Sequence, residues 1–518
     1  MSDAVDHGIT VTEISAMDQA IDVCAETTAA FVGRALRGPL NSPVLVSNFG
    51  DFRRRFGDSW ARSSLGPATR QFFDHGGKRL YIVRVANNAR GAMLCLPASG
   101  SALVLRAVDP GSTEYVRAAV DYDGLDEDDD ECFNLTLQRI NPATASILDQ
   151  EFFRKLSWSQ ESVAFVGDAL ARSGIAHVEV PYPTHRPERT TVAGRSYEPA
   201  YVDHAQAGTD GAELSNYDLV GSRREQSGVF ALEQVEQFDL LYLPPPGKGD
   251  DVGPTAVLAA ERYCRERGAQ LIVDPSAEWA SPVAAVRGIS DLGYASPNML
   301  GYFPRVRHRD DSDDVAHPAG GAIAGLLCKQ DRLYGPWSSL DQDGLNLDRR
   351  MKPDIALSDE DSNVLARAGL NCIVPGLPGR LKIVGSVTMA RGSQAHRRFS
   401  ALPVRRFCLQ LVNAIASGTR WAVFEAEDDK LAKRLDRQVS EYLGALRDLG
   451  AFAEDDFIVQ CDAGVSNRTD GKEHGITILL VFHPLGSDEP VSLTLHQTAS
   501  GFRVGSTAFG LTIRHSVP

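Results

Sequence analysis

The sequence predicts a multidomain protein of mixed class, with a doubly wound α/β domain, a β-rich insertion, an α+β C-terminal domain and extended β-strand arms at both ends. Three observations lead to this prediction. Nearly continuous apolar runs such as LYIVRV (residues 80–85) alternate with helical patterns, as in a sheet buried on both faces. Between residues 95 and 182 this texture gives way to short alternating runs. Both chain ends show the alternation of half-buried strands.

The first part of the α/β domain is predicted over residues 21–94. Apolar runs at residues 28–32 and 43–46 read as strands, and phenylalanines recur at helical spacing from residue 49 to 56. Pro67 suits the first turn of a following helix, which Gly76 ends before the LYIVRV strand.

The second part is predicted over residues 230–345. FDLLYL (residues 238–243) and QLIV (residues 270–273) read as buried strands, and a helix over residues 254–267 lies between them. Gly268 ends that helix. This βαβ unit resumes the sheet that was interrupted near residue 90.

The remaining chain is predicted in four pieces. Residues 95–229 form the β-rich insertion with surface loops, and residues 346–475 the C-terminal α+β domain, which contains a strand at 421–424 and a helix over 430–449. Residues 1–20 form an N-terminal strand arm, and residues 476–518 C-terminal strands and an arm. The segment at 8–16 precedes any domain that could cover it.

Composition excludes several classes of partner. Acidic residues outnumber basic ones, 68 to 53, and the net charge of −15 argues against nucleic acid and anionic membrane surfaces. No apolar window of about 18 residues exists, and the start of the sequence lacks the pattern of a signal peptide. We therefore expect a protein that is made and kept in a cytoplasm, with no direct membrane insertion. The eight scattered cysteines suit reduced core thiols.

Candidate catalytic and ligand-binding patterns are weak. Gly57-Asp58-Ser59 resembles one esterase nucleophile box, but no late Asp-x-x-His pair follows. Gly247-Lys248-Gly249 lacks the spacing of a phosphate loop, and the twelve histidines show no metal-binding spacing. We predict no catalytic residue, no cofactor and no metal site.

One enzymatic alternative stays open at this point. Asp239, Asp274 and Glu278 lie in or beside predicted strands, and ligands of doubly wound sheets bind at the carboxyl ends of strands. An α/β enzyme that uses these carboxylates is the second hypothesis.

A basic face is predicted on the helix over residues 430–449. Lys430, Lys433, Arg434 and Arg437 lie opposite its apolar stripe. The simplest interpretation is a solvated face, and the alternative is a surface for an acidic partner.

Several stretches together resemble one protein family. GITVTEI (residues 8–14), TTAAFVGRALRGPLNSPVLVSNFGDFRRRFG (residues 27–57) and GGKRLYIVRV (residues 76–85) resemble the N-terminal signature of the contractile tail sheath proteins of bacteriophages and related injection machines. Further matches follow in the order of that family: FDLLYLPPP (238–246), AERYCRERGAQLIVDPSAEW (260–279), YFPRV (302–306), GAIAGLLCKQDRLYGPW (321–337), LNCIV (370–374), GTRWAVFEAED (418–428) and FIVQCD (457–462).

The resemblance implies a structural subunit and not an enzyme. Such subunits stack as hexameric rings around an inner tube and contract to drive the tube through a target envelope. The expected partners are other copies of the chain, the inner tube protein, and baseplate and tail terminator or cap proteins. The expected locations are the bacterial host cytoplasm during assembly, and then the tail of a virion or a contractile particle.

By the same resemblance, the terminal arms add strands to adjacent subunits. Their positions in this sequence are Ile9, Val11 and Glu13 at the start and Val491, Leu493 and Leu495 near the end. The basic residues of the 430–449 helix would face the tube, the insertion would point outward and the C-terminal domain inward. Residues 499–518 extend beyond the strand that closes the chain in relatives.

Overall fold

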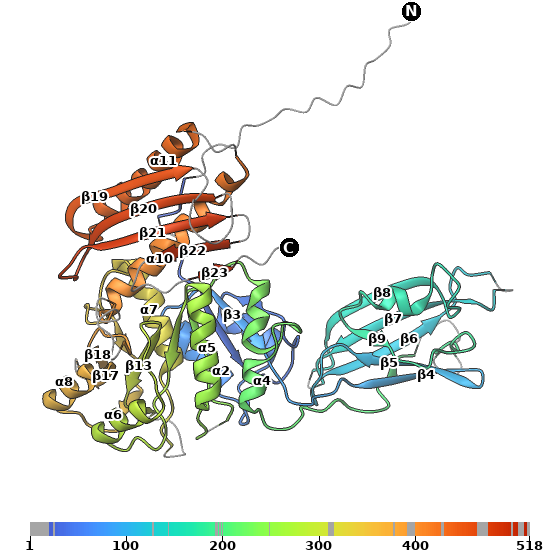
Figure 1. Ribbon diagram of the computed structural model, residues 1–518. Coiled ribbons are helices and arrows are strands. Elements are labelled where there is room, and N and C mark those ends of the chain that lie inside the picture. Colours follow the sequence, from blue (N-terminus) through green and yellow to red (C-terminus); the bar gives the residue numbers. More distant parts are fainter. Residues whose placement is uncertain are drawn as a thin grey trace, which may run out of the picture.

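In the computed structural model, the chain folds into three bodies: a central body, an insertion and a C-terminal body (Figure 1). The insertion projects from one side of the central body, and the C-terminal body lies on another side. The structure describes residues 20–23, 26–126, 129–142, 144–191, 195, 198, 200–247, 249–308, 315–376, 379–390, 399–425, 429–463, 475–498, 501–505 and 512–514.

The central body is built on a nine-stranded sheet whose strand order is β15-β18-β17-β13-β12-β11-β1-β3-β2. Its six inner strands are parallel: β3 (Leu80–Arg84), β1 (Ala29–Gly33), β11 (Leu240–Tyr242), β12 (Gln270–Val273), β13 (Met299–Phe303) and β17 (Leu370–Pro375). Antiparallel strands β2 (Val44–Val46), β18 (Leu381–Val384) and β15 (Asn346–Leu347) close its edges. The first strand in the sequence, β1, lies inside the sheet, and later strands are added on both sides of it. The predicted doubly wound arrangement is therefore confirmed.

Helices cover both faces of this sheet. One face packs against α1 (Phe49–Phe56), α2 (Leu65–Asp74) and α7 (Gly320–Tyr334). The other packs against α4 (Asn216–Val220), η1 (Gly228–Gln234), α5 (Pro254–Arg267), α6 (Pro282–Asp291) and α8 (Asp359–Arg367). Successive side chains of β1 point to opposite faces of the sheet, so Phe31 lies in the core on the α1, α2 and α7 side and Ala30 in the core on the other side. A strand buried on both faces needs apolar residues at every position, as AAFVG has.

Local sequence signals explain where the helices begin and end. The Asn48 side chain accepts a hydrogen bond from the Asp51 amide at 2.9 Å and caps α1. Helix α5 begins with Pro254 and ends at Gly268, whose φ of 67° suits a residue without a Cβ. Ser358 and Asp361 form a capping box at the start of α8.

The insertion contains two antiparallel sheets around a core of its own. The first comprises β4 (Met93–Ala98), β5 (Ser101–Ala107) and β9 (Ala176–Val178). The second comprises β10 (Val202–Asp203), β6 (Tyr115–Asp121), β7 (Cys132–Ile140) and β8 (Ile147–Ser157), and the short helix α3 (Val166–Leu170) lies nearby. All members of the core cluster fall between residues 92 and 202. The strand texture predicted over residues 95–182 is present.

The C-terminal body packs two helices on a five-stranded antiparallel sheet. The helices are α10 (Leu402–Gly418) and α11 (Asp429–Asp448). The strands, in spatial order, are β19 (Phe452–Ala463), β20 (Gly475–Pro484), β21 (Val491–Thr498), β22 (Gly501–Gly505) and β23 (Thr512–Arg514). The strand expected at 421–424 is instead a 3-10 helix, η2 (Arg420–Phe424). That prediction is wrong because the segment is a short link between two helices, in which the Ala422 amide bonds the Thr419 carbonyl at 3.0 Å.

The nine-stranded sheet reaches further along the chain than the boundary expected at residue 345. Strand β17 pairs with β13, from Gly301↔Leu370 to Phe303↔Cys372, and β18 pairs with β17. A small sheet of β14 (Val306–His308) and β16 (Met351–Pro353) also joins residues on both sides of that boundary. The C-terminal body therefore starts near α10. An apolar run predicts a strand, but it does not say which sheet the strand joins.

Candidate assembly surfaces

The structure does not gather the three carboxylates of the enzymatic hypothesis. Asp239 precedes β11 and Asp274 follows β12, and these neighbouring strands are paired in register from Leu240↔Gln270. The two carboxylates are therefore about five residues apart along the strands, or roughly 16 Å. Glu278 lies on an exposed loop. The prediction that all three residues form one site is wrong, because the two aspartates flank opposite ends of parallel strands. Asp274 and Glu278 alone line a common cavity, of about 240 Å³.

Each half-buried aspartate instead anchors a neighbouring segment. Asp239 accepts a hydrogen bond from the Thr28 amide at 2.8 Å, and burial, with the nearby Asp331 charge adding to it, raises its pKa to about 6. Asp274 accepts a hydrogen bond from the Tyr242 hydroxyl at 2.6 Å, and burial raises its pKa to about 7. These contacts hold backbone and core side chains in place.

The other weak patterns also have structural partners. Asp58 forms an ion pair with Arg53 at 2.8 Å beside the end of α1, and Lys248 lies outside the described residues. Within the described part of the chain, no group of histidine, cysteine and carboxylate side chains could hold a metal ion. No helix among the described residues is long and apolar enough to cross a membrane.

The predicted N-terminal arm positions, Ile9, Val11 and Glu13, lie outside the described residues. The segment that follows them is anchored between two bodies. Ile21 is buried in the core of the C-terminal body and approaches Gly418, whose added Cβ would lie 2.6 Å from Ile21 Cγ1. A few residues later, Thr28 leads directly into β1.

A buried ion pair joins the same segment to α7 and α10. Arg406 donates two hydrogen bonds to Asp331, at 2.7 and 2.5 Å, and both side chains are less than a tenth exposed. The Thr27 hydroxyl donates to Asp331 at 2.5 Å. A cavity of about 490 Å³ lies beside these residues, between the central and C-terminal bodies. The first described residues of the chain are thus fastened at the junction of the two bodies.

The C-terminal arm positions require a correction. Val491, Leu493 and Leu495 lie on β21, which is paired with β20 from Val491 to Thr498 and with β22 from Thr494 to Thr498, and all three side chains are buried. Where β21 is paired on both edges, as at Leu495, it has no edge to offer a neighbouring subunit, and the buried side chains make all three residues part of the body's own core. The alternating pattern of an interior strand with one buried face is identical to that of an arm, so the sequence could not separate the two.

Free edges lie elsewhere in this sheet. In the part of the chain that the structure describes, the 12-residue strand β19 is paired on one edge alone, with β20. The Ile458 side chain on this strand is 58% exposed. At the opposite edge of the sheet, β23 pairs with β22 and lies within residues 499–518, the segment that extends beyond the closing strand of relatives. An extended segment could add to β19 through backbone hydrogen bonds.

The basic helix has the two faces that the sequence predicts. The apolar side chains of α11 from Leu431 to Leu446 are buried, whereas Leu449 at the expected end of the stripe is 53% exposed. Lys430, Lys433 and Arg437 are exposed. Arg434 differs from them, because its guanidinium lies 4.2 Å from the ring centre of Trp421 on η2. The basic face of α11 is therefore exposed at Lys430, Lys433 and Arg437, whereas Arg434 also packs against Trp421 within the C-terminal body.

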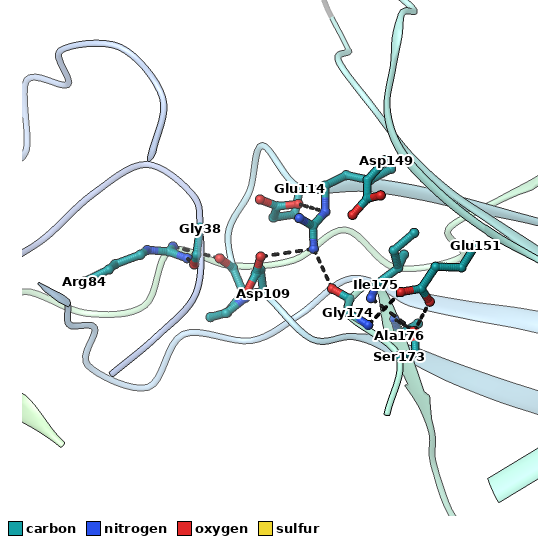
Figure 2. A network of polar contacts seen from close by, with 12 residues as sticks. Gly38, Arg84, Asp109, Glu114, Asp149, Glu151, Ser173, Gly174, Ile175 and Ala176 are labelled. Atoms are coloured by element: carbon teal, nitrogen blue, oxygen red, sulfur yellow. Dashed lines mark hydrogen bonds and ion pairs between the residues drawn. The ribbon is translucent and has the colours of Figure 1, made fainter. Parts of the chain in front are cut away.

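A network of buried charges at the base of the insertion was not predicted. Arg84 at the end of β3 is 2% exposed, and Arg139 on β7 pairs with Asp109 at 3.0 Å and Glu114 at 3.3 Å. In Figure 2, Asp109 lies between Arg84 on one side and Glu114 and Gly174 on the other. The one sequence signal of this network was Arg84, inside the apolar run LYIVRV. A buried arginine needs hydrogen-bond acceptors that are themselves buried.

Comparison with known proteins confirms the resemblance to tail sheath proteins. No family model matches the chain. A tail sheath protein of Vibrio phage KVP40 is 28% identical over 149 residues, and this match spans 28% of the chain but 21% of the phage protein.

Similarity in fold extends over nearly the whole chain. The sheath tail protein of Listeria innocua has a TM-score of 0.63 at 14% identity, over 91% of this chain and 95% of that one. The helical sheath of the anti-feeding prophage in its contracted state has a TM-score of 0.53 at 16% identity, over 94% and 97% of the two chains. The chain therefore has the fold of contractile sheath proteins.

Proposed function

We propose that this protein is the structural subunit of a contractile sheath, which polymerises as stacked hexameric rings around an inner tube and contracts to drive the tube through a target envelope. The observation that carries the proposal is the extent of the fold match, because the central body, the insertion and the C-terminal body together match single sheath chains. The role is structural and not enzymatic. The separation of Asp239 from Asp274 means that the three carboxylates of the enzymatic alternative do not share one site.

Strand exchange would link the subunits. In this proposal the N-terminal segment of one copy adds to the free edge of β19 in another copy. Backbone hydrogen bonds of this kind survive large rotations of the bodies that they join. The anchoring of Ile21, Thr27 and Thr28 at the junction of two bodies supports the proposal, because a force on the arm would be transmitted to Asp331 and Arg406.

The orientation of the subunit follows from the same proposal. The insertion points outward, and the C-terminal body points inward with the basic face of α11 toward the tube. Besides the tube protein, baseplate and tail terminator or cap proteins would contact the ends of the stack. Assembly takes place in a bacterial cytoplasm, and the product is a phage tail or another contractile particle.

No nucleotide site is required for contraction in this scheme. The extended sheath would be trapped above a contracted state of lower free energy, and the baseplate would release the barrier. The energy is then stored in subunit contacts during assembly.

The proposal predicts self-assembly of the purified chain. Negative-stain electron microscopy and light scattering of the full-length protein should show rings or tubes. Deletion of residues 2–15 should leave a folded monomer, since the described contacts begin at residue 20, and should abolish the tubes.

Two results would contradict the proposal. A full-length chain that stays monomeric at all concentrations and with a tube protein would exclude the sheath role. A deletion variant that forms tubes as well as the full chain would exclude the exchanged arm alone. Circular dichroism of both proteins separates these outcomes from a loss of folding.

A further inference from the structure

The insertion is joined to the central body by two chain crossings, which we call the neck. The outgoing crossing runs through Asn87 and Arg90, and the returning crossing pairs with it at Ala212 and Thr209. The amide of Ala212 donates to the Asn87 carbonyl at 2.8 Å, and Thr209 and Arg90 exchange two backbone bonds of 2.8 and 3.1 Å. Two paired segments alone would form a ribbon that can bend and twist.

A third segment lies across this ribbon. Residues 108–114, which connect β5 and β6 and which we call the keystone loop, contact both crossings and both bodies. The side chain of Asp210 on the returning crossing accepts hydrogen bonds from the Ser112 amide and hydroxyl, each at 2.8 Å. The Arg34 guanidinium of the central body donates to the Asp210 carbonyl at 2.9 Å.

The central body holds one side of the keystone loop through Arg84. Its guanidinium donates to the carbonyls of Ala35 at 3.0 Å and Gly38 at 2.5 Å within the central body, and to that of Pro110 at 2.7 Å in the loop. Gly111 fits tightly beside it, because an added Cβ would lie 3.1 Å from the Leu36 carbonyl oxygen. The loop has little room to move on this side.

The insertion holds the other side through Arg139. Besides its ion pairs with Asp109 and Glu114, Arg139 donates to the Gly174 carbonyl at 2.9 Å, next to β9. The Asp109 and Glu114 side chains are 7% and 2% exposed. The keystone loop is therefore held between Arg84 of the central body and Arg139 of the insertion.

The charges of this network depend on one another. Burial raises the pKa of Asp109 and of Glu114, which indicates that each charge is poorly solvated, and the two arginines balance the two carboxylates. To bend the neck, Arg84 or Arg139 would have to leave buried partners behind. Breaking a buried charge network by removing one partner is strongly unfavourable.

We propose that the neck is a rigid clamp and not a hinge, in which Arg84 and Arg139 grip the keystone loop from either side and make the insertion and the central body turn as one unit. The rigidity is a property of the single chain. Its consequence rests on the proposed function. In a contracting sheath, each outward insertion would rotate together with its central body, and the change in angle between subunits would be taken up by the terminal arms.

The experiment measures how widely the insertion moves in the monomeric full-length chain. Spin labels are attached through a ketone-bearing amino acid at positions 163 and 258, because the native cysteines would react with thiol labels. Val163 is fully exposed on the insertion, and Leu258 on α5 is 43% exposed. Pulsed electron resonance then gives the distribution of label distances. We expect a single narrow distribution in the parent protein.

Two variants open the clamp, and one serves as a control. Arg139→Met should roughly double the width of the distribution, since it frees the keystone loop from the insertion. Asp210→Ala removes the two more exposed hydrogen bonds between the returning crossing and Ser112 of the keystone loop, and it is used if Arg139→Met does not fold. The control is Arg117→Met, which removes a half-buried arginine that bonds Gln138 at 2.7 Å and stacks on Tyr201, both within the insertion. Its distribution should stay narrow.

The clamp is refuted if the parent distribution is already broad, or if folded Arg139→Met and Asp210→Ala proteins are as narrow as the control. The measurement is made on monomers, so a chain that never forms tubes would refute the proposed function and leave this test intact. Conversely, if the parent protein forms tubes but its monomer shows a broad distribution of label distances, the clamp is refuted and the proposed function is not.

Discussion

His75, at the end of α2, uses both ring nitrogens inside the fold. Its Nδ1 donates to the Gln71 carbonyl at 2.7 Å, and its Nε2 accepts from the Asp348 amide at 3.0 Å, so the ring is held neutral. The side chain is 6% exposed, and burial lowers its pKa. Protonation would break the bond from Asp348, which ties α2 to β15.

This arrangement predicts a stability that depends on pH. Because the pKa of His75 is lower in the folded chain, this residue binds more protons in the unfolded chain once the pH falls below about 6.5, and its contribution to the free energy of unfolding decreases there. Its contribution is fully present above that pH. The variant His75→Gln should flatten the decrease by up to about 1.4 kcal/mol per pH unit.

Urea unfolding of both proteins between pH 7.5 and 5.5 gives the two slopes. Asp348 is a poor source of the effect, because its hydrogen bond with Arg350 holds its pKa at about 2, far below this range. Asp239 and Asp274, whose pKa values are raised to about 6 and about 7, titrate within the range in both proteins, so the difference between the two slopes reports His75. Equal slopes for the parent and His75→Gln would show that His75 titrates alike in the folded and unfolded states.

At the scale of single residues, the sequence identified buried positions but not their partners. Arg84 stands out in its apolar strand, yet its three carbonyl acceptors come from segments up to 49 residues away. Asp239 and Asp274 looked equivalent as residues beside strands, and the paired register alone shows that they lie at opposite ends. Hydropathy records whether a side chain is buried and carries no information on what it meets.

Helix α11 is the element whose sequence pattern and structure agree best. Its apolar stripe is buried from Leu431 to Leu446, and the 3.6-residue period places Lys430, Lys433 and Arg437 on the opposite, exposed face. At β21 the same kind of reasoning failed, because an arm and an interior strand share one pattern. Strand type follows from local sequence, whereas strand pairing is a contact between distant segments.

The basic face of α11 provides the test at this scale. Replacing Lys433 and Arg437 by Glu should lower the yield of tubes formed around the tube protein at least tenfold at low salt, because an acidic partner would then meet like charges. The loss should shrink as salt rises. Arg434 is left unchanged, since its contact with Trp421 would mix packing with charge.

The matched control places the same charge change on the central body, at Arg349→Glu and Lys352→Glu, two exposed positions. Sedimentation of tubes at several salt concentrations compares the two double variants. If both assemble like the parent, the basic face of α11 is a solvated surface.

For the whole molecule, the separate core of the insertion predicts that it can be removed. Asn87 and Ala212 are directly paired, so residues 88–211 can be replaced by an Asn-Gly turn that closes a hairpin. The remaining chain should keep one cooperative unfolding transition. The loss of the Arg84 bond to Pro110 and of the Arg34 bonds to Asp210 and Gly211 should cost about 1 kcal/mol each.

Differential scanning calorimetry of the shortened chain gives this result, with residues 88–211 expressed alone as its companion. A shortened chain without a transition would mean that the insertion supports the central body. An isolated insertion without a transition would mean that its own core is insufficient.

The sequence by itself determined the order and type of most elements, the mixed α/β class, the β-rich insertion and the resemblance to sheath proteins. These features follow from local periodicity, caps and short motifs, which act over a few residues. The tertiary structure decided that β17 and β18 join the central sheet, that β21 is an interior strand, and that Arg84 and Arg139 meet across the keystone loop. Those outcomes depend on contacts between segments tens to hundreds of residues apart, and the free energy of such contacts is set by which surfaces fit together and not by either segment alone.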